Sequence, residues 1–176
     1  MASNRHLGRI VALQCLYEFD FRARSGDTPD ISEILERHLA RYKNTIDDLK
    51  FVEALVRGSV EQAEVLDGEI QPLAPDWPLD QIARIDHMIL RLAFYELFKL
   101  KDADIPPKVT INEAVELAKS FGAEKSSKFV NGVLGSAWRK EHPEDTPNDT
   151  KDSVKTQQEP AQSSAEEPAE ITEGDD

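Results

Sequence analysis

The chain is poor in cysteine, since Cys15 is the only one among 176 residues. No disulfide can therefore form within the chain, which fits a reducing compartment. The apolar and aromatic neighbours Leu13, Leu16 and Tyr17 predict that Cys15 is a small buried thiol and not a nucleophile.

Long apolar runs are lacking as well. No segment approaches the roughly 20 apolar residues that a helix needs to cross a bilayer. The opening stretch MASNRHLGRI is not followed by the apolar segment of a signal peptide. We therefore expect a soluble, cytoplasmic protein.

The residue patterns of common catalytic sites are also missing. The histidines share no metal-ligand spacing with one another or with the cysteine, and there is no glycine-rich phosphate loop. Carboxylates are numerous but scattered over polar helix faces. These absences predict a protein that is not an enzyme and that uses no metal or cofactor. The four histidines are His6, His38, His87 and His142.

Alternating strand patterns do not occur, whereas apolar residues recur at steps of three or four along most of the chain. This periodicity predicts an all-α fold of about six to seven helices. The expected helices cover residues 4–24, 31–42 (capped by Asp30), 46–71, 79–100, 110–121 and 124–139.

Three prolines in PLAPDWP mark a boundary between an N-terminal helical subdomain, residues 1–72, and a C-terminal one, residues 73–140. The helix expected over 79–100 is apolar on nearly every side, so it should form the centre of the second half.

The ends of the last two helices carry specific signals. Thr110 and Glu113 are spaced as a capping box, which predicts that a helix begins at Thr110. Gly122 is expected to end this helix as a left-handed C-cap. Gly132 and Gly135 lie inside the last helix and are expected to be points of close contact with a neighbouring backbone.

Negative charge is concentrated at the C-terminus. Residues 141–176 contain 12 acidic and 2 basic residues, a net charge of −10, whereas residues 1–140 contain 22 acidic and 19 basic residues, a net charge of −3. Low hydrophobicity and high like charge predict that 141–176 is a disordered acidic tail. Two roles stay open for it: competition with nucleic acid for a basic patch, or solubilisation alone.

Two small groups of basic residues could form such a patch. Arg5 and Arg9 share one face of the first helix, with His6 beside them. Lys125 and Lys128 share a face at the start of the last helix, in the segment KSSKF that ends at Phe129. The lysines could serve solubility alone and Phe129 could be a core residue. An aromatic ring beside lysines is also the combination on which single-stranded nucleic acid stacks its bases.

Three segments of the sequence resemble the NusB family of bacterial transcription antitermination factors. They are LQCLYEFD, RLAFYEL and INEAVELAKSFGAEKSSKFVNGVL, and the resemblance covers roughly residues 5–140. It implies two small helical bundles packed perpendicular to each other. It also implies that the protein pairs with NusE, binds the single-stranded boxA element of nascent ribosomal RNA and helps RNA polymerase to pass terminators.

The resemblance also implies roles for individual residues. It assigns RNA contact to Arg5, His6, Arg9, Lys125, Lys128 and Phe129, and NusE contact to Tyr17, Asp80 and Asp86. Two departures from the family pattern affect the first set: the usual run of arginines is reduced to two, and a lysine stands at 125 where an acidic residue is common. Fewer phosphate contacts predict a shallower dependence of RNA binding on salt.

Two alternatives belong to other functional classes. The chain could be a protein-interaction scaffold whose RNA contact is incidental. The helical module also resembles the N-terminal, RNA-binding region of certain ribosomal RNA cytosine methyltransferases. No α/β pattern or cofactor loop follows Lys140, so this chain cannot carry that catalysis itself.

Overall fold

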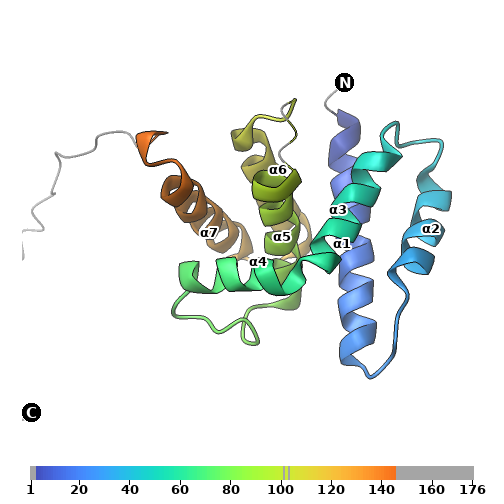
Figure 1. The fold of residues 1–176 in the computed structure, drawn as a ribbon, viewed down its shortest axis with the longest axis horizontal. Helices are drawn as coiled ribbons and strands as arrows, with labels where there is room; N and C mark the ends of the chain where they lie inside the picture. Colours follow the sequence, from blue (N-terminus) through green and yellow to red (C-terminus); the bar gives the residue numbers. More distant parts are fainter. Residues whose placement is uncertain (1–2, 101, 103, 146–176) are drawn as a thin grey trace, which may run out of the picture. The chain divides into compact units, whose positions relative to one another are not determined.

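A computed structural model of the protein describes residues 3–100, 102 and 104–145, and within them the fold is all-α, as predicted, with seven α-helices and no strand (Figure 1). None of these helices combines the length and the apolar character that crossing a bilayer requires. The helices are α1 (Ser3–Arg24), α2 (Ile31–Tyr42), α3 (Leu49–Glu61), α4 (Ala63–Ile70), α5 (Arg84–Phe94), α6 (Pro107–Phe121) and α7 (Ser126–Glu141).

The single helix expected over residues 46–71 is in fact two helices. Its first part, α3, begins at a side-chain cap in which Asp48 accepts from the amide of Phe51 at 3.0 Å. The chain leaves helical geometry at Gln62 (φ −105°, ψ 17°), and α4 then runs across the direction of α1 and α3 (Figure 1). The apolar stripe continues through this break, so periodicity alone could not reveal it.

The helix expected over residues 79–100 begins later and changes type. Residues 79–81 form a turn, residues 82 and 83 are not helical, α5 begins at Arg84, and the last six residues form the π-helix η2 (Tyr95–Leu100). The expected burial is confirmed, because most side chains of α5 are buried. A π-helix inside a longer helix often marks a functional or specially packed position, and here it holds the buried carboxylate of Glu96.

The expected capping box at Thr110 is wrong. Helix α6 begins three residues earlier, with Pro107 in its first turn, where a missing amide hydrogen costs nothing. Thr110 lies inside the helix, and its hydroxyl donates to Glu96 Oε1 at 3.0 Å. A tertiary hydrogen bond therefore takes the side chain that the motif assigns to a cap.

Of the roles expected for three glycines, only one part is confirmed, because Gly122 is the C-cap that ends α6. Gly122 is not left-handed, since its φ is −91°, and Gly132 is exposed with open space where a Cβ would lie. At Gly135 the nearest atoms belong to an arginine of the same helix. Gly58 of α3, for which no such role was predicted, does allow close packing, because a Cβ there would overlap the ring of Tyr95.

One hydrophobic core includes buried residues from every helix, from α1 to α7. The division into subdomains at residues 72 and 73 stays a prediction. The start of the expected disordered tail is ordered: Glu141 still belongs to α7, and Pro143–Asp145 forms a 3-10 helix. The ring of His142 stacks on Trp138 with centroids 3.6 Å apart, which holds this end in place. Residues 146–176 lie outside the described part of the chain.

Candidate nucleic-acid interface

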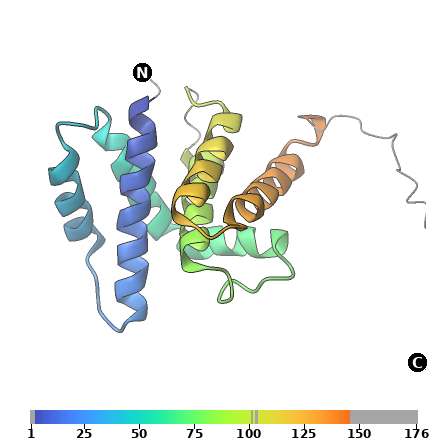
Figure 2. The ribbon, with the colours of Figure 1, turned by 180° about the vertical axis from the view of Figure 1, so that it is seen from behind.

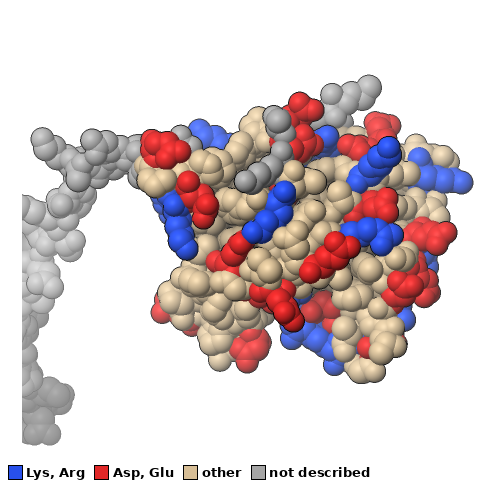
Figure 3. All heavy atoms as spheres, in the orientation of Figure 1, with Lys and Arg blue, Asp and Glu red and all other residues tan. Residues whose placement is uncertain are grey.

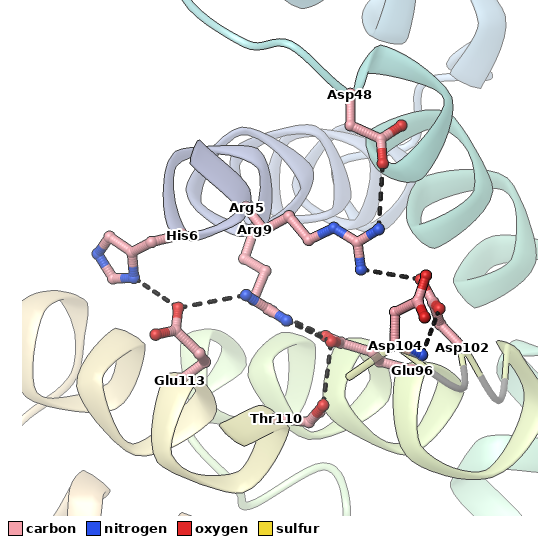
Figure 4. Close-up of polar contacts among 9 residues, drawn as sticks. All are labelled: Arg5, His6, Arg9, Asp48, Glu96, Asp102, Asp104, Thr110 and Glu113. Atoms are coloured by element: carbon pink, nitrogen blue, oxygen red, sulfur yellow. Dashed lines mark hydrogen bonds and ion pairs between the residues drawn. The ribbon is translucent and has the colours of Figure 1, made fainter. Parts of the chain in front are cut away.

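Arg5, near the start of α1, is held by carboxylates from two distant segments. Its guanidinium donates to Asp102 Oδ2 at 2.8 Å and to Asp48 Oδ2 at 3.3 Å (Figure 4). It also lies over the ring of Phe51, 4.8 Å from the centroid. The Arg5 side chain is partly exposed. Its charge is locally neutralised, but it remains at the surface.

Arg9, one turn further along α1, points into the protein. Only 3% of the residue is exposed, and its guanidinium makes a two-pronged ion pair with Glu96, with Nε to Oε2 at 2.9 Å. A further contact of 3.4 Å joins it to Glu113 of α6 (Figure 4). Glu96 in turn accepts from Thr110. The charge of Arg9 is therefore paired with buried carboxylates. Because the side chain does not reach the surface, its position does not support a direct contact with RNA.

His6 lies on the side of α1 that faces α6. Its Nδ1 is 2.7 Å from Glu113 Oε2, and 41% of its side chain is exposed. Glu113 thus joins two residues of α1, His6 and Arg9, to α6. These contacts place the start of α1 against the first half of α6, where the imidazole reaches solvent.

The second basic group lies at the turn between α6 and α7. Lys125 and Lys128 are exposed, and neither forms an ion pair within the described residues. Phe129 is half-buried and packs against the core. Phe129 is thus neither a fully buried core residue nor a fully exposed one. Phe121, at the end of α6, is an exposed aromatic residue close to this turn in the chain, and it was missed because it continues the apolar stripe of α6.

The two basic groups lie toward opposite ends of α6. Helices α1 and α6 run in the same direction, and the α6–α7 turn follows the far end of α6 (Figure 2). From Glu113, which contacts His6, to Phe121 the helix advances about 12 Å at 1.5 Å per residue. The predicted RNA contacts therefore do not form one compact cluster, and any single ligand that touches both groups must be extended.

The α6–α7 turn is built by three residues that share close contacts. A Cβ on Gly122 would come within 2.5 Å of the Ser126 Cβ and 2.7 Å of the Ala118 carbonyl oxygen, so only glycine fits there. The Ser126 hydroxyl accepts from the amide of Ala123 at 2.9 Å and donates to Asp86 Oδ2 at 2.8 Å. The turn is therefore tied to the start of α5.

Asp86, one of the three residues assigned to a partner, is buried in the structure. It is 6% exposed, and burial raises the pKa of its carboxyl despite the hydrogen bond from Ser126. The other two residues assigned to a partner are at the surface: Tyr17 is 37% exposed and Asp80 is exposed. Phe21, four residues after Tyr17, is also exposed, with the guanidinium of Arg84 over its ring at 5.4 Å. The spacing of four could have identified it from the sequence.

Charge is mixed on the face of the molecule that carries α3 and α4. In Figure 3, Lys and Arg alternate with Asp and Glu over the face that carries α3 and α4, and no area of one sign forms. Among the described residues, no group of three or more metal-binding side chains lies close enough to hold a metal ion.

Comparison with known proteins agrees with the motifs. A sequence profile described as the NusB family matches residues 6–139. Transcription antitermination protein NusB of Chloroflexus aggregans is 43% identical over 136 residues, 77% of this chain and 87% of that protein. The protein of the same name from Dehalococcoides mccartyi is 39% identical over 136 residues, 77% of this chain and 90% of that protein.

Solved structures show the same relationship. A structure of NusB from T. maritima is 35% identical with a TM-score of 0.68, covering 80% of this chain and 96% of that one. A crystal structure of antitermination factors NusB and NusE in complex with double-stranded RNA matches with 27% identity and a TM-score of 0.68, over 80% of this chain and 99% of that one. The chain described here belongs to the NusB family.

Proposed function

We propose that this chain is a transcription antitermination factor that, together with NusE, binds the boxA element of nascent ribosomal RNA and supports processive transcription by RNA polymerase. The observation that carries the proposal is the α6–α7 turn, where two exposed lysines, Lys125 and Lys128, come just before the half-buried ring of Phe129. In this role the chain binds and does not catalyse, it needs no cofactor, and it works in the cytoplasm.

Each part of the turn suits one part of an RNA strand. Phosphates carry the negative charge that Lys125 and Lys128 attract, and these contacts supply affinity without sequence information. The exposed edge of Phe129 offers a surface for an unpaired base, which is worth about 1–3 kcal/mol per stacked base. Its buried edge, packed on the core, holds the ring in place before RNA arrives.

The start of α1 supplies the second part of the proposed surface. His6 reaches solvent beside α6, and the partly exposed Arg5 points to Asp48 and Asp102 on another side of α1 (Figure 4). The buried Arg9 holds the start of α1 in place, because it joins α1 to Glu113 and Glu96. A strand that touches both groups spans several nucleotides.

The first test is the binding of a fluorescent single-stranded boxA RNA to Phe129→Ala, measured by anisotropy with and without NusE. We expect the loss of one stacked base, about 1–3 kcal/mol, or roughly 5- to 150-fold in Kd. Phe129→Tyr, which keeps the ring, is the matched control and should bind like the wild type. Equal binding by Phe129→Ala and the wild type would remove the ring from the site.

A second test separates phosphate contact from base stacking. The Lys125→Ala/Lys128→Ala variant should lower the slope of log Kd against log salt by up to about 1.4, because each phosphate contact on a single strand contributes about 0.7. Phe129→Ala should leave this slope unchanged. A duplex of the same sequence, whose bases are not free to stack, should be insensitive to Phe129→Ala and should lose affinity only with the lysines.

A protein-interaction scaffold is the second candidate function, favoured by one observation. Tyr17 and Phe21 form an exposed aromatic pair on one face of α1, with Asp80 also at the surface. If the Tyr17→Ala/Phe21→Ala variant loses NusE while the wild-type chain alone binds no RNA at low salt, the scaffold explains the protein better than the proposed RNA surface.

A further inference from the structure

The start of α7 lacks the usual means of stabilising a helix N-terminus. Its N-cap position is occupied by Lys125, which makes no side-chain capping bond, and its first turn contains no acidic residue. The first amides of a helix have no partner within the helix, so the start of α7 depends on hydrogen bonds from elsewhere. The hydrogen bond that fixes this helix start therefore comes from a residue of another element.

Asp86 provides it. Its Oδ2 accepts from the Ser126 hydroxyl at 2.8 Å, and Ser126 is the first residue of α7. Asp86 also lies in the first turn of α5, so one carboxylate faces the starts of two helices. Its Oδ1 is buried and has no hydrogen-bond partner within the described residues. A carboxylate kept in such surroundings needs a reason, and a surface contact with a partner cannot supply it at 6% exposure.

The chain of bonds continues from Asp86 into the turn. The same Ser126 oxygen accepts from the amide of Ala123, so the Asp86 carboxylate, the Ser126 hydroxyl and the Ala123 backbone are joined in series. Gly122 allows this approach, because any larger residue there would collide with Ser126. Residues 122–126 are thus fixed at both ends, and Lys125 lies within them.

We infer that Asp86 is a positioning residue for the RNA-contacting turn, acting through Ser126. The inference rests on the proposed RNA-binding function. The carboxylate sets where α7 begins, and thereby sets how Lys125, Lys128 and Phe129 are presented together. Burial raises the pKa of Asp86, which means that a neutral residue of the same shape should be tolerated at this position.

The test uses that tolerance. Asp86→Asn keeps an oxygen that accepts from Ser126 but removes the charge, whereas Asp86→Ala removes the acceptor. The full-length variants are titrated with fluorescent single-stranded boxA RNA in the absence of NusE. Asp86→Asn should bind like the wild type, and Asp86→Ala should bind about three- to tenfold more weakly, the range for one lost hydrogen bond. A contact with the partner through charge predicts the reverse: no change in either variant without NusE, and equal losses with NusE.

A second variant guards against misfolding and tests the series of bonds. Ser126→Ala removes a single oxygen and should weaken RNA binding at least as much as Asp86→Ala. The double variant should bind no more weakly than Ser126→Ala alone, because both changes break the same path. Far-UV circular dichroism and urea titration confirm that each variant is folded at the assay temperature.

The controls separate this inference from the proposed function. Asp80→Ala, an exposed carboxylate outside the turn, should leave RNA binding without NusE unchanged. If the wild type binds RNA and loses it with Lys125→Ala/Lys128→Ala, but Asp86→Ala and Ser126→Ala bind normally, the positioning role is overturned and the RNA surface stands. If the wild type does not bind RNA more tightly than the lysine variant, the RNA surface itself is overturned, and the positioning role with it.

Discussion

Replacing Arg9 by methionine separates a structural role of this residue from RNA contact. Methionine keeps an unbranched stem near the ring of Phe51, over which Arg9 lies at 5.3 Å, but it leaves Glu96 buried without its cation. Removing one member of a buried ion pair costs about 3–5 kcal/mol. For a domain of this size that loss lowers the Tm by about 10–15 °C.

The assay combines urea and thermal unfolding with RNA titration. Arg9→Met should be strongly destabilised, and Arg9→Met/Glu96→Gln should recover much of the loss, because glutamine carries no charge and still accepts from Thr110. Arg5→Ala is the matched comparison, since that partly exposed arginine should cost about 1 kcal/mol or less.

RNA affinity decides the interpretation. Measured at a temperature where Arg9→Met is folded, its affinity for single-stranded boxA RNA should equal that of the wild type within error, because the side chain does not reach the surface. An Arg9→Met variant that melts like the wild type but fails to bind RNA would refute the interior role and restore Arg9 to the RNA surface.

Three other variants or treatments test the same structure. Burial opposes ionisation of Asp67, but hydrogen bonds from Arg91 and His87 outweigh it and lower its pKa to about 2. The ionised form therefore contributes about 2 kcal/mol to the free energy of unfolding above roughly pH 4, and this contribution is lost as the pH falls toward 2. In urea titrations, Asp67→Asn should be less stable than the wild type at neutral pH and as stable as the wild type near pH 2. Burial, together with a nearby carboxylate, raises the pKa of Cys15 to about 12, so iodoacetamide should label it at pH 8 only after denaturation. Gly58→Ala would overlap the adjacent tyrosine ring of η2 and should lower stability by about 1–3 kcal/mol in the same urea assay.

Regular apolar spacing was enough to predict where most helices lie, and side-chain capping was enough to start one of them. The α2 helix begins as predicted, with Asp30 accepting from the amide of Ser32 at 2.8 Å. The failures share a cause: they occur where a tertiary contact overrides a local preference. Thr110 bonds to Glu96 and does not cap a helix, and Gly122 makes room for Ser126 and does not turn left-handed.

The candidate site was predictable in the same uneven way. A sequence shows that Arg5 and Arg9 share a helix face, but it does not show which carboxylates oppose them. Those carboxylates come from 43 to 104 residues away in the chain, at Asp48, Glu96, Asp102 and Glu113, positions that only the fold brings to α1.

The α6–α7 turn was easier to predict because its lysines have no distant carboxylate to neutralise them among the described residues. Their position nevertheless depends on a carboxylate 40 residues earlier in the chain, at the start of α5. An exposed charge can therefore be read from local sequence, whereas the residue that orients it cannot. Loss of RNA binding on Asp86→Ala, with binding retained in Asp86→Asn, would show that orientation and charge at this turn are supplied by different parts of the chain.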